Sequence, residues 1–251
     1  METLENMRIT FVALILSPIV LCFSVSHAED GQTGLRMEMV EQVIVNIERT
    51  QHETRVSTLD PEIIAAMRNI PRHEFVPEEL RPFAYFDIPL PVGSEQNTSQ
   101  PYLIALMTQL AGVDKDDRVF ETGTGSGYHA AILSRLAARV FSVEVVKPLA
   151  DSAARRLMLM GYANIEVRHA DGFYGWKERG PFDAMIIKEA VPQIPATLIN
   201  QLKPGGRLIA PVGLPDRGQM LTVIEKRDDG TIKSTPLIPV KFSPLQGGER
   251  I

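Results

Sequence analysis

The stretch Val119-Phe120-Glu121-Thr122-Gly123-Thr124-Gly125-Ser126-Gly127-Tyr128 decides the fold of this chain. It reads as a short buried strand ending in a carboxylate, then a turn with three alternate glycines, then the start of an Ala- and Leu-rich helix over 128–138. Glycine permits positive φ angles and a close approach of the backbone to a ligand, and a helix start offers unpaired N–H groups. The segment therefore predicts a ligand-binding loop at the carboxyl end of a strand in an open parallel sheet.

The spacing of the glycines indicates which ligand the loop binds. The dinucleotide fingerprint and the phosphate-binding loop would both need a glycine at position 128, which is Tyr128. The pattern E-x-G-x-G-x-G instead resembles the first motif of methyltransferases that use S-adenosylmethionine. The alternative is a glycine-rich turn without a ligand.

Apolar segments alternate with helical ones downstream of residue 117, which is typical of a parallel sheet with helical crossovers. Helices are predicted over 35–47, from the N-cap Asp60 to 69, and over 101–111, with an irregular segment at 72–100. The other predicted strands and helices cover the following ranges: strands 118–121, 140–145, 165–168, 183–187 and 207–210; helices 128–138, 148–160 and 193–202. Gly205-Gly206 is expected to form a turn, and 220–242 adds two strands. The prediction is an α/β, doubly wound, mostly parallel seven-stranded sheet of the S-adenosylmethionine-dependent methyltransferase type.

The N-terminus has the pattern of a secretory signal. An apolar run at 9–26 follows Arg8 and ends in Ser26-His27-Ala28. We expect residues 1–28 to be a signal peptide and 29–251 to be a single methyltransferase domain, periplasmic or secreted. The alternatives are an uncleaved membrane anchor, and translation from Met7.

Composition narrows the class of partners and sites. The net charge of −5 gives no overall basic field for nucleic acid. Cleavage would remove Cys22, the only cysteine, and the five histidines lack metal-ligand spacing, so no metal site is expected. His129, after the glycine loop, is interpreted as structural or adjacent to the ligand.

Two further carboxylates follow predicted strands. Glu144 ends the second strand, where it can accept hydrogen bonds from both ribose hydroxyls, and Asp171-Gly172 follows the third, where an adenine edge would lie. The alternatives are a solvated strand-end acid and a plain Asp-Gly turn. The predicted cofactor-binding residues are Glu121, Gly123, Thr124, Gly125, Ser126, Gly127, Glu144, Asp171 and Gly172.

Motifs across roughly 35–248 resemble the protein-L-isoaspartate (D-aspartate) O-methyltransferase family. They are P-R-H-E-F-V-P at 71–77, L-P-V-G at 90–93, T-S-Q-P-Y at 98–102, the glycine loop, A-D-G at 170–172 with G-W at 175–176, P-F-D-A at 181–184 and L-K-P-G-G-R-L at 202–208. The resemblance implies methyl transfer from S-adenosylmethionine to the free carboxylate of L-isoaspartyl or D-aspartyl residues in damaged proteins, which initiates their repair. It implies Ser99 as the active-site serine and Gln96, Thr98 and Lys188 as substrate-binding residues. Isoaspartyl proteins or peptides are the expected partners of a monomer.

The chain departs from the family pattern in two places. Glu95 replaces a glycine, and Lys188-Glu189 replaces small residues, so Lys188 pairs either with a substrate carboxylate or with Glu189. For Ser99, the alternative role is a helix cap before Pro101. For the whole chain, the alternatives are a methyltransferase that acts on another carboxylate or small molecule, and a non-catalytic adenosyl-binding protein. For its location, the alternative is the cytoplasm, where the cofactor is made.

Overall fold

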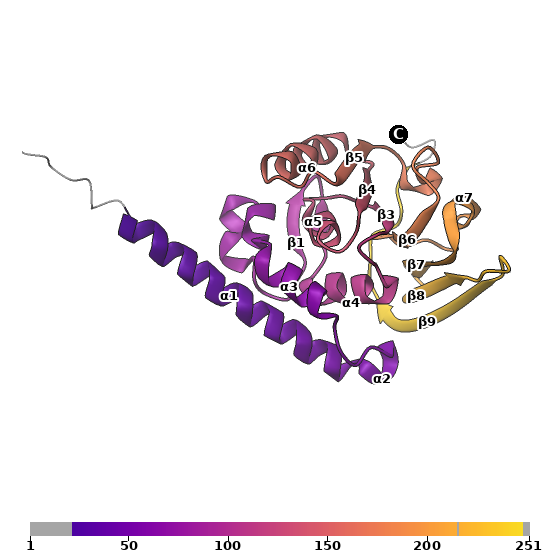
Figure 1. Cartoon of the computed structure of the whole chain (residues 1–251), viewed down its shortest axis with the longest axis horizontal. Helices are drawn as coiled ribbons and strands as arrows, with labels where there is room; N and C mark the ends of the chain where they lie inside the picture. Colours follow the sequence, from indigo (N-terminus) through magenta and orange to yellow (C-terminus); the bar gives the residue numbers. More distant parts are fainter. Residues whose placement is uncertain (1–21, 215, 248–251) are drawn as a thin grey trace, which may run out of the picture. The chain divides into compact units, whose positions relative to one another are not determined.

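The computed structural model describes residues 22–214 and 216–247 and divides the chain into two units, 1–34 and 35–251. In the first unit, residues 22–34 are helical; they begin α1 (Cys22–Arg49), which continues into the second unit (Figure 1). The helix predicted over 35–47 is thus part of a longer one. The expected signal peptide lies mostly outside the described residues, and its end at Ala28 falls within α1, so that boundary stays a prediction.

Within the described ranges, none of the helices combines the length and the apolar character needed to span a membrane.

Two helices before the sheet each have one end at the capping residue that predicts it. After α2 (Gln51–Thr54), Asp60 Oδ1 accepts a hydrogen bond from the Glu62 amide at 2.7 Å and starts α3 (Pro61–Asn69). Gly112, with a φ of +62°, ends α4 (Pro101–Ala111). Between α3 and α4, the segment expected to be irregular contains two 3-10 helices, η1 (Arg72–Phe75) and η2 (Glu78–Phe83), and a hairpin of β1 (Leu90–Gly93) and β2 (Gln96–Thr98).

Seven strands form the predicted sheet, in the order β5-β4-β3-β6-β7-β8-β9. Strands β3 to β7 pair in parallel, and β8 and β9 are antiparallel additions at one edge. Their bounds are β3 (Arg118–Thr122), β4 (Arg139–Glu144), β5 (Ile165–His169), β6 (Phe182–Ile186), β7 (Leu202–Leu214), β8 (Gly218–Lys226) and β9 (Ile232–Val240). The chain changes direction across the sheet between β3 and β6, so the glycine loop lies at the switch point where open α/β sheets bind ligands.

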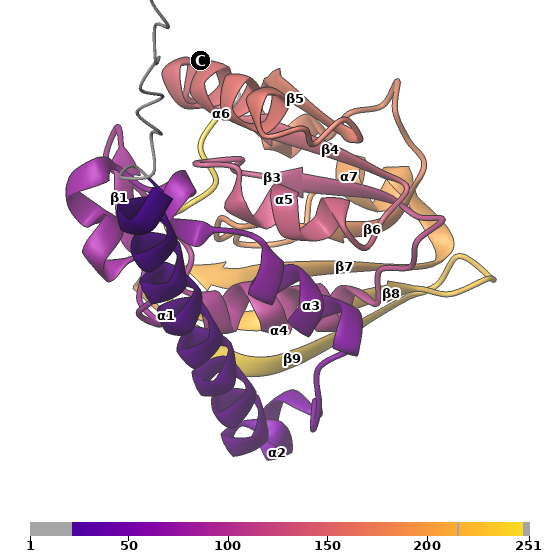
Figure 2. The ribbon, with the colours of Figure 1, turned by 60° about the vertical axis from the view of Figure 1, so that its left-hand side comes forward.

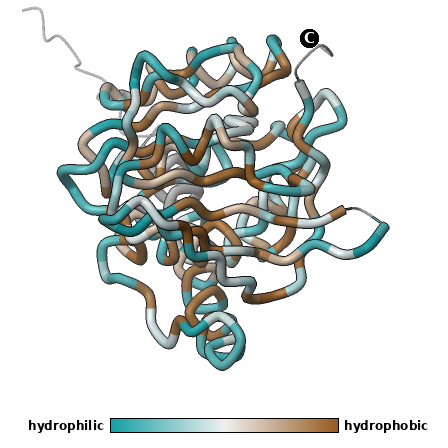
Figure 3. The backbone as a smooth tube through the Cα atoms, turned by 90° about the vertical axis from the view of Figure 1, so that its right-hand side faces the viewer, coloured by the Kyte–Doolittle hydropathy of each residue, from teal (hydrophilic) through white to brown (hydrophobic). Residues whose placement is uncertain are grey.

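The inner strands β4, β3 and β6 are buried on both faces, to which the alternate side chains of each strand point. In β3, Val119 joins one hydrophobic cluster with α4, α5 (Tyr128–Ser134) and α6 (Lys147–Leu159), whereas Phe120 joins a second cluster with α7 (Ala196–Gln201). Figure 2 shows α5 in front of the strands and α7 behind them. In Figure 3 the hydrophobic colour follows the inner strands, and the hydrophilic colour gathers on outer turns.

Several element boundaries differ from the sequence prediction, among them the end of α5, the start of α7 at Ala196 rather than 193, and the start of β7. Helix α5 ends at Ser134 rather than near 138, and the Asn164 side chain donates to the carbonyls of Ser134 and Ala137, at and just beyond this end, at 2.8 and 3.1 Å. Gly205-Gly206 was expected to form a turn, but it lies inside β7, next to an irregularity in the β6–β7 register. Glycine is common at such bulges, since it has no Cβ.

Candidate active site

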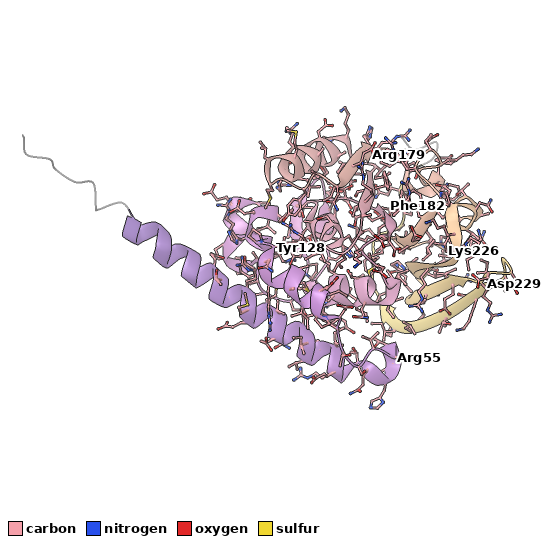
Figure 4. All side chains as sticks on the ribbon, in the orientation of Figure 1. Arg55, Tyr128, Arg179, Phe182, Lys226 and Asp229 are labelled. Atoms are coloured by element: carbon pink, nitrogen blue, oxygen red, sulfur yellow. The ribbon has the colours of Figure 1, made fainter. Side chains whose placement is uncertain are left out.

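The loop after β3 adopts the backbone shape that its glycines predict. Gly123, Gly125 and Gly127 have φ angles of +63°, +55° and +91°. The Thr124 amide donates to the Val143 carbonyl at 3.2 Å, which holds the loop against β4. Gly127 is the N-cap of α5, whose first residue, Tyr128, is buried (Figure 4).

Glu144 organises this loop from the end of β4. Its Oε2 accepts a hydrogen bond from the Gly125 amide at 2.8 Å, and its Oε1 accepts one from the Val146 amide at 2.9 Å. A carboxylate has about four acceptor positions, so two remain for hydroxyl groups of a ligand.

One pocket brings together most of the predicted cofactor and substrate residues. The predicted residues that line it are Gln96, Thr98, Ser99, Gly123, Thr124, Gly125, Ser126, Glu144, Gly172 and Lys188. Segments that are about 25 or more residues apart, the β2–α4 connection and the glycine loop, thus face the same space. The C-terminal segment 241–246 also lines it, which the sequence analysis missed because that segment carries no recognisable motif.

Three predicted cofactor residues do not line this pocket. Gly127 packs its backbone against Leu157 of α6. Asp171 lines a neighbouring, mostly apolar pocket, where its Oδ1 accepts from the Phe173 amide at 2.9 Å and its carboxyl abuts Gly247. Glu121 is fully buried beneath the loop.

Glu121 and Lys188 form a buried ion pair. Lys188 Nζ lies 2.8 Å from Glu121 Oε2, with side-chain exposures of 9% and 0%, and Ser142 Oγ donates to Glu121 Oε1 at 2.7 Å. The ion-pair partner of Lys188 is therefore Glu121 rather than Glu189.

Glu189 lies against the glycine loop. The Thr122 hydroxyl accepts a hydrogen bond from the Lys188 amide at 3.2 Å and donates one to the Glu189 carboxyl. A Cβ on Gly123 would overlap that carboxyl unless Glu189 moved, and the φ of +63° at this position also favours glycine. Burial raises the pKa of Glu189 to about 7, although the Thr122 hydrogen bond and Lys188 favour its ionised form. Glu189 lines the pocket, and the sequence analysis noted it only as a departure from the family pattern.

Ser99 is partly exposed toward the pocket, and its hydroxyl makes no hydrogen bond to the residues that the structure describes. The N-cap of α4 is Gln100, without a side-chain cap bond, so the alternative of a helix-capping Ser99 was wrong. Glu95 sits exposed at the hairpin tip with a φ of +59°, outside the pocket lining.

Arg72 holds the Ser99 segment in place. It is fully buried, and it donates to the carbonyls of Ala84, Ile88 and Ser99 at 3.0, 3.3 and 3.2 Å. Its guanidinium also lies 5.3 Å from the centroid of the Tyr128 ring. This role is not apparent from the sequence, although Arg72 belongs to the motif at 71–77.

His129 has a structural contact and also lines the pocket, whereas its adjacency to a ligand stays a prediction. The Thr108 hydroxyl donates to the Ile104 carbonyl at 2.7 Å, so it accepts from His129 Nε2–H at 2.9 Å. Burial lowers the pKa of His129 well below its ordinary value, and the ring is neutral. The other ring nitrogen, Nδ1, is then an acceptor, and it has no hydrogen-bond partner among the residues that the structure describes.

Comparisons with known proteins agree on one family. Residues 38–250 match the family model described as "Protein-L-isoaspartate(D-aspartate) O-methyltransferase (PCMT)". The chain is 42% identical over 238 residues to protein-L-isoaspartate O-methyltransferase 2 of Syntrophobacter fumaroxidans, covering 95% of this chain and 96% of that one. It is 46% identical over 202 residues to the protein of the same name from Nitrosococcus oceani, covering 80% and 92%.

Solved structures show the same fold. A protein-L-isoaspartate O-methyltransferase with 30% identity superposes with a TM-score of 0.70, covering 84% of this chain and 67% of that one. A Plasmodium falciparum structure described as a putative protein-L-isoaspartate O-methyltransferase in complex with S-adenosyl-L-homocysteine superposes with a TM-score of 0.67 at 24% identity, covering 82% and 97%.

Proposed function

The chain belongs to the protein-L-isoaspartate (D-aspartate) O-methyltransferase family, and we propose that its pocket aligns an isoaspartyl carboxylate, held at Ser99, with the methyl group of S-adenosylmethionine, held at the loop 123–127. It is an S-adenosylmethionine-dependent protein carboxyl O-methyltransferase, and its acceptors are isoaspartyl-containing proteins. The observation that carries the residue assignment is the single pocket lined by both the Ser99 segment and the glycine loop.

The residues at the loop fit this cofactor. A Cβ on Gly125 would meet only the Gly123 carbonyl, at 3.7 Å, so the glycine leaves open space for a ligand. Glu144 retains acceptor capacity for ribose hydroxyls, and Gly172 lines the pocket on the side of β5. When bound, the cofactor supplies an electrophilic methyl group on a positively charged sulfur.

The acceptor carboxylate needs no general base, so the task of the protein is to hold and orient it. An unperturbed carboxylate has a pKa of about 4 and is ionised at neutral pH. Ser99 would donate its hydroxyl hydrogen to one carboxylate oxygen of the acceptor and so orient the other oxygen toward the side of the pocket at which the cofactor would present its methyl group. Arg72, which binds the Ser99 carbonyl, fixes the position of that segment.

Replacing Ser99 with alanine is expected to lower kcat/KM for an isoaspartyl peptide about 100-fold, which corresponds to about 2.7 kcal/mol of transition-state stabilisation. Affinity for S-adenosylmethionine should stay near that of wild type, because the hydroxyl contacts the acceptor. Labelled-methyl transfer to an isoaspartyl peptide and to its aspartyl twin measures the first effect, and calorimetry measures the second.

Ser234→Ala, at an exposed position of β9, is the matched control and should leave transfer unchanged. Equal rates in the Ser99 and Ser234 variants would contradict the role of Ser99. Transfer by wild type to neither peptide would contradict the isoaspartyl acceptor and leave another carboxylate as the candidate.

We also propose that the chain is exported, with residues 1–28 removed, and works as a monomer outside the cytoplasm. The support is the apolar run at 9–26 after Arg8 and the small residues Ser26 and Ala28. Since the cofactor is made in the cytosol, an exported enzyme needs a supply route for it.

A fusion of residues 1–30 to a reporter that is active only outside the cytosol is expected to give activity, and N-terminal sequencing of the processed chain should begin at Glu29. A fusion that lacks residues 9–26 is the control and should be inactive. Recovery of only the full-length chain, in the cytosolic fraction, would contradict export.

A further inference from the structure

Four neighbouring parallel strands place two glycines and two carboxylates at their carboxyl ends, in an order set by the topology. Gly172 follows β5, Glu144 ends β4, Gly123 follows β3 and Glu189 follows β6, and these strands lie side by side as β5-β4-β3-β6. All four residues line the pocket. If the ribose lies at Glu144 and the adenine toward β5, the methionyl end of the cofactor reaches the side of Gly123 and Glu189. The inference thus rests on the proposed function.

The Glu189 carboxyl is fixed at this position from two sides. The Thr122 hydroxyl donates to it, and it fills the space that a side chain on Gly123 would need. The side chain of the preceding residue, Lys188, pairs instead with Glu121. Lys188 thus contacts Glu121, and Glu189 contacts Thr122. Of the two carboxyls of Glu121 and Glu189, that of Glu189 lines the pocket.

The charges around Glu189 favour a cation in this part of the pocket. The ionisable groups near it are Glu121, Lys188 and Glu144, with the neutral His129 and the exposed Lys241 on other parts of the pocket wall. Glu121 and Lys188 cancel each other, so the other charged side chains of the pocket wall are the carboxyls of Glu144 and Glu189 and the exposed ammonium of Lys241. The methionyl end of the cofactor carries an ammonium, a sulfonium and a carboxylate, and its net charge is positive.

We propose that Glu189 binds the cationic methionyl end of S-adenosylmethionine, and that it thereby sets the strength and the charge preference of cofactor binding in this chain. An oxygen of Glu189 not used by Thr122 accepts from the ammonium or lies against the sulfonium. Attraction between opposite charges within a few ångström is strong in a site that is shielded from water.

Three ligands separate the two cationic groups and provide an internal control. S-adenosylmethionine carries both the ammonium and the sulfonium, S-adenosylhomocysteine carries the ammonium alone, and methylthioadenosine carries neither. Glutamine at position 189 keeps the acceptor for Thr122 and the shape of the side chain, but it removes the charge.

Calorimetry on the purified full chain is expected to show that Glu189→Gln weakens S-adenosylmethionine binding about tenfold, equivalent to about 1.4 kcal/mol, and leaves methylthioadenosine binding unchanged. Weaker binding of S-adenosylhomocysteine as well assigns the contact to the ammonium, and an effect on S-adenosylmethionine alone assigns it to the sulfonium. Glu95→Gln, an equal loss of charge at an exposed position outside the pocket, should change none of the three affinities.

The pH dependence supplies a second readout. Because the pKa of Glu189 is raised to about 7, its carboxyl becomes ionised as the pH rises through neutrality. Wild-type affinity for S-adenosylmethionine should therefore increase from about pH 6 to about pH 8, and Glu189→Gln should lose that increase.

Equal losses for all three ligands, or none for S-adenosylmethionine, would overturn the role of Glu189. If wild type binds none of the three, the proposed function fails instead.

Discussion

Replacing Lys188 with methionine is expected to lower the free energy of unfolding by about 3–5 kcal/mol, because it leaves the charge of Glu121 buried without a partner. Glu121 is 0% exposed, and its remaining contact is the Ser142 hydroxyl at 2.7 Å. One hydroxyl does not compensate a buried carboxylate. Chemical denaturation of wild type and variant at neutral pH measures the difference.

The double variant Glu121→Gln, Lys188→Met should recover most of this loss, since it removes both charges and keeps an acceptor for Ser142. Lys147→Met is the matched control. It breaks the exposed pair with Asp151, at 2.9 Å, and should leave stability nearly unchanged. A Lys188 variant as stable as the Lys147 variant would show that Glu121 is neutralised in some other way.

The sheet was predictable because its signals are local. Each parallel strand is a short apolar run between helical segments, and β3 to β6 appear at the predicted places, whereas β7 is much longer than the strand predicted over 207–210. Two helix ends are local in the same way. Asp60 caps the start of α3 with its own carboxylate, and Gly112 ends α4 because a residue without a side chain adopts a positive φ easily. The β1–β2 hairpin was missed because Ser94 and Glu95 occupy its turn with φ angles of +52° and +59°, where glycine or asparagine is the usual signal.

The gathering of residues in one pocket was predictable only for residues whose position follows from the strand that they end or follow. Glu144 and the glycines followed from strand-end position and spacing, and the structure brings them into one pocket with Ser99. Pairings across strands were not predictable: the partner of Lys188 depends on the register between β3 and β6, and that of Arg72 on the folding of residues 84–99. The place of the C-terminal segment in the pocket wall was not predictable for the same reason, because it depends on a tertiary contact between Pro244 and Ala190.

Replacing Gly125 with valine is expected to abolish measurable binding of S-adenosylmethionine, while the protein still folds. Gly125 has a φ of +55°, which a β-branched residue resists, at a cost of about 1–3 kcal/mol of local strain. A Cβ there nevertheless meets no protein atom closer than 3.7 Å, because the space belongs to the pocket. The side chain would therefore occupy the volume that the ligand needs, and calorimetry should detect no heat of binding.

The neighbouring glycines would give a less clear answer, since a Cβ would overlap Glu189 at position 123 and approach Leu157 to 3.1 Å at position 127. Gly161→Val is the better control. Gly161 also has a positive φ, of +80°, but it has open space around it and lies outside this pocket. It should show a similar backbone cost in thermal denaturation and unchanged cofactor affinity. If the Gly125 variant binds S-adenosylmethionine within about threefold of wild type while remaining folded, which is less than about 0.7 kcal/mol, then the cofactor does not pass over this loop, and the assignment of the pocket is wrong.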